Sequence, residues 1–140
     1  MELTREIVLA EPPGKRLDSW IAEKVMGWRK KTFPGGGGGF TAWVDENEKV
    51  MKLISNSTMS ETCYRCDYFR PSTDTAAVWE VEEEIDKRNL RVAYCQALQM
   101  VIRSQKDYVT TFDYVHATPE QRCKAALLAV MEGEDEHERD

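Results

Sequence analysis

The sequence contains neither a long apolar segment nor a recognisable catalytic motif. No apolar run approaches the roughly 18–20 residues that a membrane-spanning helix needs, which argues against a membrane protein. The serine of a nucleophile elbow, the zinc-protease pattern HExxH and the dinucleotide-binding pattern GxGxxG are all missing. We therefore expect a binding protein and not an enzyme, with no catalytic residue and no cofactor.

A secretory signal is missing as well. The chain begins MELTREIVLA, which lacks the positively charged start and apolar stretch of such a signal, and this argues against secretion. The four cysteines are therefore expected to be reduced thiols in a cytoplasm.

Two of the cysteines, Cys63 and Cys66, form a CxxC pair that resembles half of a zinc site. The remaining ligands would have to come from Cys95 and Cys123, or in part from His116, none of which has matching spacing. A redox pair would need a thioredoxin-like strand and helix around it, and the neighbouring sequence does not have that pattern. We therefore interpret both thiols as ordinary side chains and expect no metal site.

The chain does have enough apolar residues for one core. It has 140 residues, of which 41% are hydrophobic, and a formal net charge of −6. The last nine residues hold six acids and one arginine, a net charge of −5, which leaves −1 for the rest. We expect residues 1–13 to be a lead, 14–132 a single domain and 133–140 an acidic disordered tail. No sustained basic stripe favours DNA or RNA, whereas a small anion needs only two or three cations.

The first half of the domain is predicted to contain a helix and two strands. Apolar residues recur every three or four positions over residues 15–29, which predicts an amphipathic helix that ends near Gly27. Five glycines at 35–39 predict a loop; a phosphate cradle is the alternative, but the Lys-Ser/Thr ending of a P-loop is absent. Residues 40–54 predict a strand, a turn at DENE and a second strand, and residues 55–66 predict a surface loop.

The second half is predicted to be mostly helical. The segment STD at 72–74 predicts the start of a helix that ends near Arg88. Polar residues recur at helical spacing in 90–103, which favours a helix, whereas alternation in 107–115 predicts a strand. The segment TPEQ from Thr118 predicts the capped start of the last helix. These elements indicate the α/β (α+β) class, with helices packed over a small, mainly antiparallel sheet.

Three stretches, in this order and spacing, resemble the phage ABA-sandwich domain family. They are LD…AEKVMGW in residues 17–28, PSTD…AVWEV in 71–81 and ATPEQRCKAALLAV in 117–130. Together they frame about residues 14–132, and the resemblance implies an ABA-sandwich-like fold. The glycine run, the Cys63/Cys66 pair and residues 90–106 depart from the simplest members, which leaves the ligand preference open.

That family contains phage anti-defence proteins that act against Thoeris immunity. The resemblance implies a phage protein in the cytoplasm of the infected bacterial host. It also implies a homo-oligomer, as a dimer or a multiple of dimers such as a hexamer. Such proteins bind and sequester, without cleaving, glycocyclic ADP-ribose isomers made by TIR enzymes, and some also hold the cyclic di- and trinucleotides of CBASS. The preferred isomer, a second site and the oligomer number stay open.

A ligand of this kind needs flat or apolar walls for adenine, and cations and N–H donors for the pyrophosphate. The candidate ligand-binding residues are rings, cations and hydroxyls close to helix ends: Trp28, Arg29, Phe69, Arg70, Ser72, Thr73, Trp79, His116, Thr118, Arg122 and Lys124. Arg122 and Lys124 are the preferred phosphate contacts, because cations in the first turns of a helix are unfavourable unless an anion is nearby. Each candidate also has a structural interpretation, as a core ring, a helix cap or a solvated charge.

Two other functions fit the sequence. One is a phage interaction protein that binds a host protein through the same scaffold. The other is a small hydrolase or zinc-binding protein. Measurement of nucleotide uptake, a pull-down from infected cells and metal analysis distinguish these two functions from a nucleotide sponge, meaning a protein that sequesters nucleotides without cleaving them.

Overall fold

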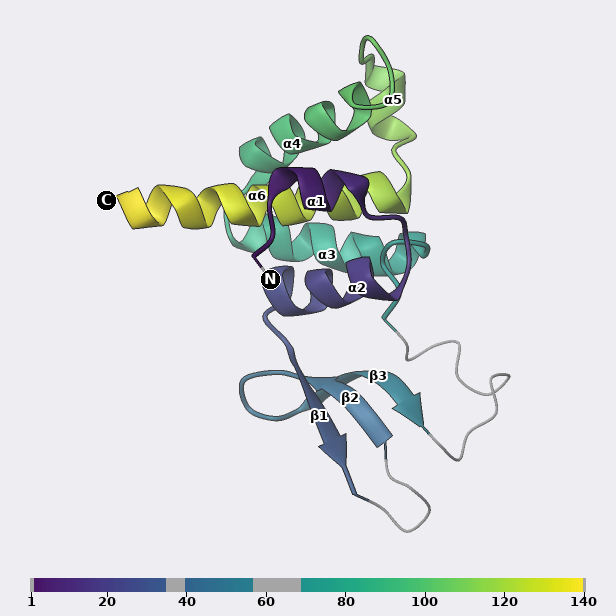
Figure 1. Cartoon of the computed structure of the whole chain (residues 1–140), viewed down its shortest axis with the longest axis vertical. Coiled ribbons are helices and arrows are strands. Elements are labelled where there is room, and N and C mark those ends of the chain that lie inside the picture. Colours follow the sequence, from purple (N-terminus) through teal and green to yellow (C-terminus); the bar gives the residue numbers. More distant parts are fainter. Residues whose placement is uncertain (1, 35–39, 57–68, 140) are drawn as a thin grey trace.

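The computed structural model describes residues 2–34, 40–56 and 69–139, and only the backbone of 54–56 and 134–139. The elements in chain order are α1 (Arg5–Ala10), α2 (Lys15–Trp20), the π-helical turn η1 (Ile21–Val25), β1 (Arg29–Phe33), β2 (Phe40–Val44), β3 (Val50–Asn56), α3 (Thr75–Lys87), α4 (Arg91–Arg103), α5 (Thr111–Val115) and α6 (Pro119–Arg139) (Figure 1). The predicted α+β class is confirmed.

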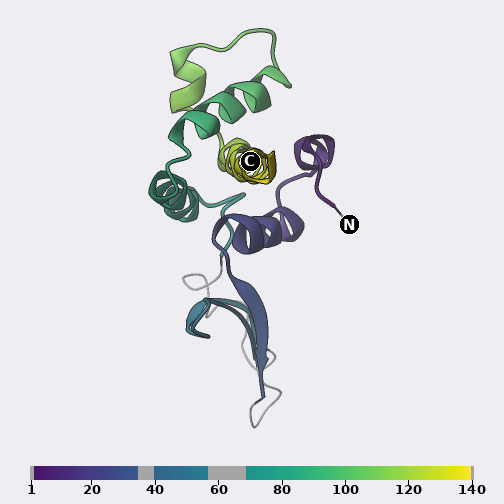
Figure 2. The same ribbon diagram turned by 90° about the vertical axis from the view of Figure 1, so that its left-hand side faces the viewer.

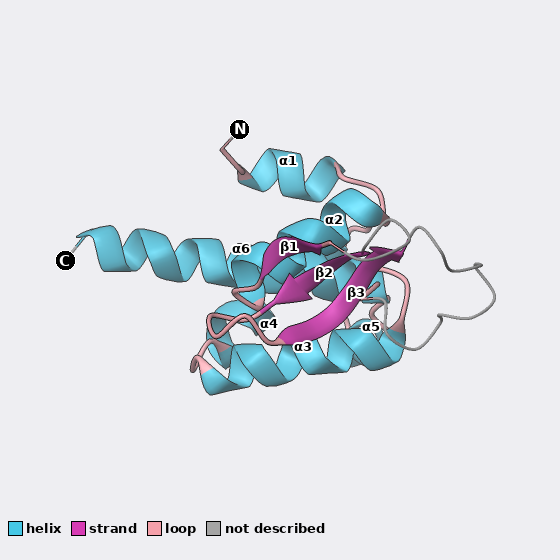
Figure 3. Cartoon of the chain, turned by 90° about the horizontal axis from the view of Figure 1, so that it is seen from below, coloured by secondary structure: helices cyan, strands magenta, loops and turns pink. Residues whose placement is uncertain are grey.

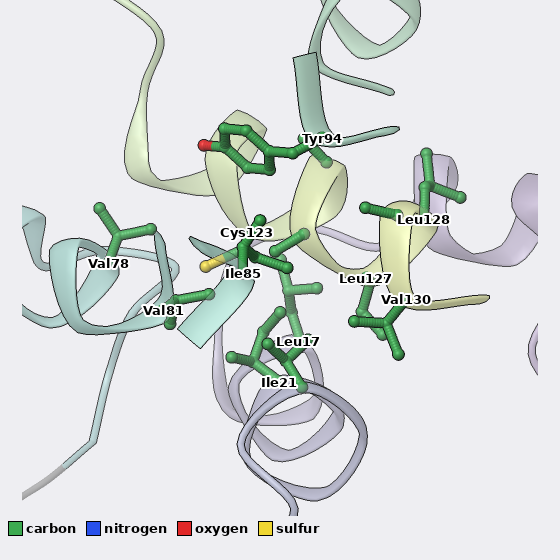
Figure 4. Close-up of a cluster of buried hydrophobic side chains, with 14 of the residues drawn as sticks. Leu17, Ile21, Val78, Val81, Ile85, Tyr94, Cys123, Leu127, Leu128 and Val130 are labelled. Carbon is green, nitrogen blue, oxygen red and sulfur yellow. The ribbon is translucent and has the colours of Figure 1, made fainter. Parts of the chain in front are cut away.

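Helix α6 is the central element. Helices α1, α2, α3 and α4 and the turn η1 all contact it, and Figure 2 views it end-on with these helices around it. Apolar side chains of α2, α3 and α6 meet in the core, among them Leu17, Val81 and Leu127, which are each fully buried (Figure 4). Burying a side chain of this size stabilises the fold by about 1.5–3 kcal/mol. The helices predicted from residues 72–74 and from Thr118 therefore each present an apolar face to the core.

The first predicted helix, over 15–29, is shorter than expected. It consists of α2 and η1 and ends at Val25, after which Gly27 adopts a positive φ of 76°. The N–H of Trp28 donates to the carbonyl of Ala22 at 2.9 Å and closes the helix end. Arg29 then begins β1, a strand that the sequence does not indicate, because its residues RKKTF open with three consecutive cations and hold a single apolar side chain.

The sheet is antiparallel in the order β1-β2-β3. The strand pair predicted in residues 40–54 is confirmed as β2 and β3, joined by the turn at 45–49. The central strand buries Ala42, Trp43 and Val44, and Trp43 belongs to the core that the helices form. Figure 3 shows the sheet crossing one side of the helices.

Capping contacts close both ends of helix α3. The carboxylate of Asp74 accepts a hydrogen bond from the N–H of Ala76 at 3.0 Å. Asn89 takes a positive φ of 59° after the last turn, and the N–H of Leu90 donates to the carbonyl of Ile85. The helix favoured for residues 90–103 follows as α4 and is confirmed.

The strand predicted in residues 107–115 is wrong, because residues 111–115 form the short helix α5. Thr110 and Asp113 make a reciprocal capping box there. The alternating aromatics that suggested a half-buried strand are exposed instead, Tyr108 by 70% and Phe112 by 68%. No strand of the described residues lies beside them to supply a partner.

The predicted start of the last helix is confirmed. The N–H of Thr118 donates to the side-chain oxygen of Gln121, and the N–H of Gln121 donates back to the Thr118 hydroxyl. Helix α6 then continues through Arg139, whereas the sequence analysis expected a disordered tail over 133–140. The glycine run at 35–39 and the Cys63/Cys66 pair lie outside the described residues.

Candidate functional site

The structure brings four of the candidate residues together where β1 begins and α3 is about to begin. Trp28 and Phe69 pack edge to face, with ring centroids 4.9 Å apart, and both are buried. The next residue, Arg70, is exposed. The two rings therefore hold each other in the core, and Arg70 is the member of this group that a ligand can reach.

Ser72 belongs to the same junction and is buried. Its N–H donates to Asp18 Oδ1 at 2.8 Å, and its hydroxyl oxygen accepts from the N–H of Gly14 at 3.0 Å. These contacts attach the start of α2 to the turn before α3, so Ser72 is a structural residue. Burial raises the pKa of Asp18, against the opposing effects of the Ser72 hydrogen bonds and the positive charge of Arg70.

Two further candidates lie close to the start of α3, Thr73 before its cap and Trp79 in its second turn. Thr73 is exposed, and its hydroxyl donates to the carbonyl of Arg70. Trp79 is 61% exposed, so its ring is available to a ligand or to another chain. Beside it, Lys52 of β3 and Glu80 form an ion pair at 3.4 Å that connects the sheet to this helix. The cap of α3 is the carboxylate of Asp74, which opposes an anion at that helix end.

The arginine that follows Trp28 begins β1, and its side chain contacts the turn between β2 and β3. Arg29 Nη2 lies 2.7 Å from Glu48 Oε1, and Lys31 Nζ lies 2.7 Å from the other oxygen of the same carboxylate. Nothing in the sequence distinguishes Glu48 as a site residue, because an acid is common in a turn of this composition.

Arg122, a preferred phosphate candidate, is engaged within the chain. Its Nη1 donates to Glu82 Oε2 at 3.0 Å, and its Nε and Nη2 donate to the carbonyls of Ala117, Tyr114 and Val115. The hydroxyl of Tyr94 donates to the same Glu82 oxygen, and burial followed by this carboxylate raises the pKa of Tyr94. Arg122 therefore connects α3, α4 and α6 with the end of α5.

Lys124, the other preferred candidate, is buried. Its Nζ donates to the carbonyl of Leu9 at 2.9 Å and to Glu120 Oε1 at 3.0 Å, and its side chain is 5% exposed. It therefore stabilises the end of α1 against α6. The positive charge of Lys124 near the start of α6 is offset by this carbonyl and this carboxylate, so it needs no ligand.

The candidates before α6 remain at the surface. His116 is exposed and stacks on Phe112, with ring centroids 4.1 Å apart. Thr118 is exposed and caps α6. The exposed rings of Tyr108 and Phe112, with Val115, give this end of the molecule an apolar surface that the sequence analysis had assigned to a strand.

The acid Glu82 lies on the side of α3 that meets α4 and α6. It is half-buried and accepts from both Tyr94 and Arg122. Together with Asp18 and Glu120, it raises the pKa of the buried Cys123 thiol, which burial raises most. Cys123 is therefore an inert core residue. No group of three His, Cys, Asp or Glu side chains within the described ranges is placed to hold a metal ion.

The comparisons with known proteins give one match. In the part of the chain that the structure describes, no helix is sufficiently long and apolar to span a membrane. No curated protein and no solved structure matches the sequence. Residues 19–127, most of the chain, match the family described as the phage ABA sandwich domain. The helix-and-sheet architecture and this match together show that the chain belongs to the phage ABA sandwich domain family.

Proposed function

We propose that this protein is a phage anti-defence sponge that works in the cytoplasm of the infected host. It binds cyclic nucleotide immune signals and sequesters them without cleavage. Glycocyclic ADP-ribose isomers made by the TIR enzymes of Thoeris are the first ligand class, and the cyclic di- and trinucleotides of CBASS are the second. The observation that carries the proposal is the family match over residues 19–127.

Exposure divides the candidate residues into two groups. Trp28, Phe69 and Ser72 are buried among partners, and Arg122 and Lys124 are held by carbonyls and carboxylates. The exposed candidates are the ones that a ligand can contact: Arg29, Arg70, Thr73, Trp79, His116 and Thr118. Rings, cations and hydroxyls are all present in this second group, which suits a base, a pyrophosphate and riboses.

Trp79 is the ring we assign to the base. It is 61% exposed on α3, a helix that is otherwise fixed to α6 by buried side chains. An indole on a rigid helix loses little conformational freedom on binding, and stacking on a base contributes about 1–3 kcal/mol. We propose that the protein acts as a homo-oligomer, in which a second copy completes the surface around this ring.

Calorimetric titration tests the ligand class. The protein is titrated with glycocyclic ADP-ribose, with other cyclic ADP-ribose isomers and with cyclic oligonucleotides. We expect saturable binding of at least one of these, and Trp79→Ala should weaken it about tenfold, the loss of one stacked base. Val92→Ala is the matched control, because Val92 is also an exposed apolar residue on a helix. No heat with any ligand contradicts the proposal.

A second function has one observation in its favour. Tyr108, Phe112 and Val115 are each at least 65% exposed around α5, which suits a protein-binding surface. A pull-down from infected cells that depends on Phe112, without any nucleotide uptake, would favour an interaction protein over a sponge.

A further inference from the structure

The first strand of the sheet carries two cations that share a single acid. Arg29 and Lys31 are alternate residues of β1, and each contacts a different oxygen of Glu48 at 2.7 Å. We call these three residues the β1 clamp. Their side chains stay open to solvent, Arg29 by 56%, Lys31 by 33% and Glu48 by 51%. The carboxylate therefore marks a position between two cations that another oxyanion can reach.

Two aromatic rings continue the same side of the strand. Lys31 Nζ lies 5.2 Å from the centre of the Phe33 ring, and Phe33 stacks on Phe40 of β2 at 4.8 Å with an interplanar angle of 16°. Alternate residues of a strand share one face and are separated by about 6.6–6.8 Å. The face therefore presents two cations and then a flat ring in equal steps.

Lys30 shows that this arrangement belongs to one face. Its Nζ lies 5.5 Å from the ring centre of Trp43, its cross-strand partner, which is buried in the core. Lys30 therefore lies on the side of the sheet opposite to Arg29 and Lys31, although it stands between them in the sequence.

The acid of the clamp is held in an uncommon backbone conformation. Glu48 has a φ of 63°, in the left-handed region that glycine and asparagine adopt more readily. Exposed ion pairs contribute little to stability, so the fold gains little from this glutamate. The hydrogen bonds from Lys31 and Arg29 hold the pKa of Glu48 below its ordinary value.

We propose that the β1 clamp and the Phe33–Phe40 pair form a binding site for an adenine nucleotide that carries a diphosphate. The diphosphate takes the position of the Glu48 carboxylate between Arg29 and Lys31, and the base lies against the phenylalanine rings. Glu48 occupies the cation pair when no ligand is present and competes with the phosphate. The choice of an adenine nucleotide as the ligand rests on the proposed function; the β1 clamp is a second position for such a ligand, separate from Trp79 and from the base assigned to that ring.

The test uses ADP and inorganic pyrophosphate as probes at low ionic strength, with binding followed by the amide NMR signals of β1 and β2. Lys31→Ala should weaken binding of both probes at least about tenfold through the loss of a charge-assisted contact. Lys30→Ala is the matched control, since it removes the same charge from the opposite face, and it should change affinity by less than about twofold. Equal losses of affinity in the two variants would show that the probes bind by nonspecific charge attraction, and this result would overturn the proposal.

Variants of Glu48 test the proposal more specifically. Glu48→Gln and Glu48→Gly both remove the competing carboxylate, and the glycine also suits the left-handed backbone. Each should tighten ADP binding about two- to fivefold, the strength of an exposed ion pair. Unchanged or weaker binding in both variants overturns the proposal. Phe33→Leu should weaken the binding of ADP and leave the binding of pyrophosphate unchanged. An equal effect on both probes would show that the Phe33 ring does not contact the base.

These probes also separate the clamp from the proposed function. Binding of ADP that follows the expected order of variants, without any uptake of cyclic signals, would support the clamp and contradict the sponge. The opposite result is that ADP does not bind at β1 and that Lys31→Ala and Glu48→Gln leave the uptake of cyclic signals unchanged. It would support the sponge and contradict the clamp.

Discussion

Arg122 and Lys124 lie two positions apart on α6 and bind the carboxyl ends of two different helices. Arg122 donates to carbonyls at the end of α5, and Lys124 donates to the carbonyl of Leu9 at the end of α1. Free carbonyls and the helix dipole make such ends favourable for cations. Each cation also has an acid beside it, Glu82 or Glu120. The two residues therefore position short helices around the central one.

Removing this arginine should cost stability. Arg122→Ala removes the arginine donor of the α5 carbonyls and one of the two donors of Glu82, and we expect a loss of about 1–3 kcal/mol in the free energy of unfolding. Urea unfolding followed by circular dichroism measures it. Arg103→Ala, an exposed arginine at the end of α4, is the control and should change stability by less than about 0.5 kcal/mol. Equal stabilities for the two variants would contradict the structural role.

Asp18 should make part of the stability depend on pH. Its pKa is higher in the folded chain than its ordinary value of 3.8, so the folded state binds this proton more tightly. The contribution of Asp18 is therefore present at low pH and is lost as the pH rises through the folded pKa. Asp18→Asn keeps an acceptor for the Ser72 N–H without the charge. The Asp18→Asn variant should therefore gain stability relative to the wild type as the pH rises from about 3 to about 7.

The opposite trend, with wild type gaining on Asp18→Asn as the pH rises, would mean that the Ser72 hydrogen bonds and Arg70 outweigh burial. The measurement is a series of urea titrations of both proteins across this range, each fitted for the free energy of unfolding.

Sequence spacing could predict which residues lie near helix ends, but not their partners. The capping pair Thr118 and Gln121 is local, and its contacts were predicted correctly. The contact between Arg122 and Glu82 spans 40 positions, and that between Lys124 and Leu9 spans 115. Such contacts depend on how helices pack, which periodicity alone does not give. Local helix electrostatics alone predicts a binding role for these cations, because it does not include the carbonyls of α1 and α5.

At the scale of elements, the differences between prediction and structure lie where two signals compete. Residues 107–115 alternate in polarity, but the capping box of Thr110 and Asp113 is a helix signal, and it is the signal that the structure follows. Residues 15–29 have helical spacing to their end, but Gly27 stops the helix and β1 begins. Elements with a single strong signal, such as α3 and α6, were predicted from sequence.

The same substitution should therefore have opposite effects at two glycines. Gly27 has a φ of 76°, and an added Cβ would meet only Arg88 Nη2 at 3.8 Å, an ordinary contact. Gly27→Ala should cost about 1–2 kcal/mol for the left-handed backbone. Gly133 lies inside α6, so Gly133→Ala should stabilise by up to about 1 kcal/mol. Thermal unfolding of both variants checks the signs, and a stabilising Gly27→Ala would show that this residue does not end the helix by its conformation.

At the scale of the whole molecule, helices surround α6 and the sheet extends from them on one side (Figure 1). The connection between the two parts includes the buried rings of Trp28, Trp43 and Phe69. The exposed rings lie on both parts, with Trp79 on α3, Phe112 on α5 and the half-buried Phe33 on β1. A ligand or a second copy of the chain that spans these surfaces would contact elements far apart in the sequence.

Ligand binding should therefore stabilise the whole fold. At a ligand concentration about 100 times the Kd, the free energy of unfolding should rise by about 2.7 kcal/mol. For a domain of this size, that raises the Tm by several degrees. Differential scanning fluorimetry with and without glycocyclic ADP-ribose measures the shift, and linear ADP-ribose is the control for a ligand without the ring closure. An identical Tm at saturating ligand would contradict folded-state binding.

The most direct measurement is the recovery of a captured signal. The protein is incubated with glycocyclic ADP-ribose until the free nucleotide is depleted, separated from unbound ligand and then denatured, and the supernatant is analysed by mass spectrometry. A sponge returns the intact cyclic nucleotide in proportion to the protein used. A linear or hydrolysed product in the supernatant, or a free nucleotide concentration that never falls, would contradict sequestration without cleavage.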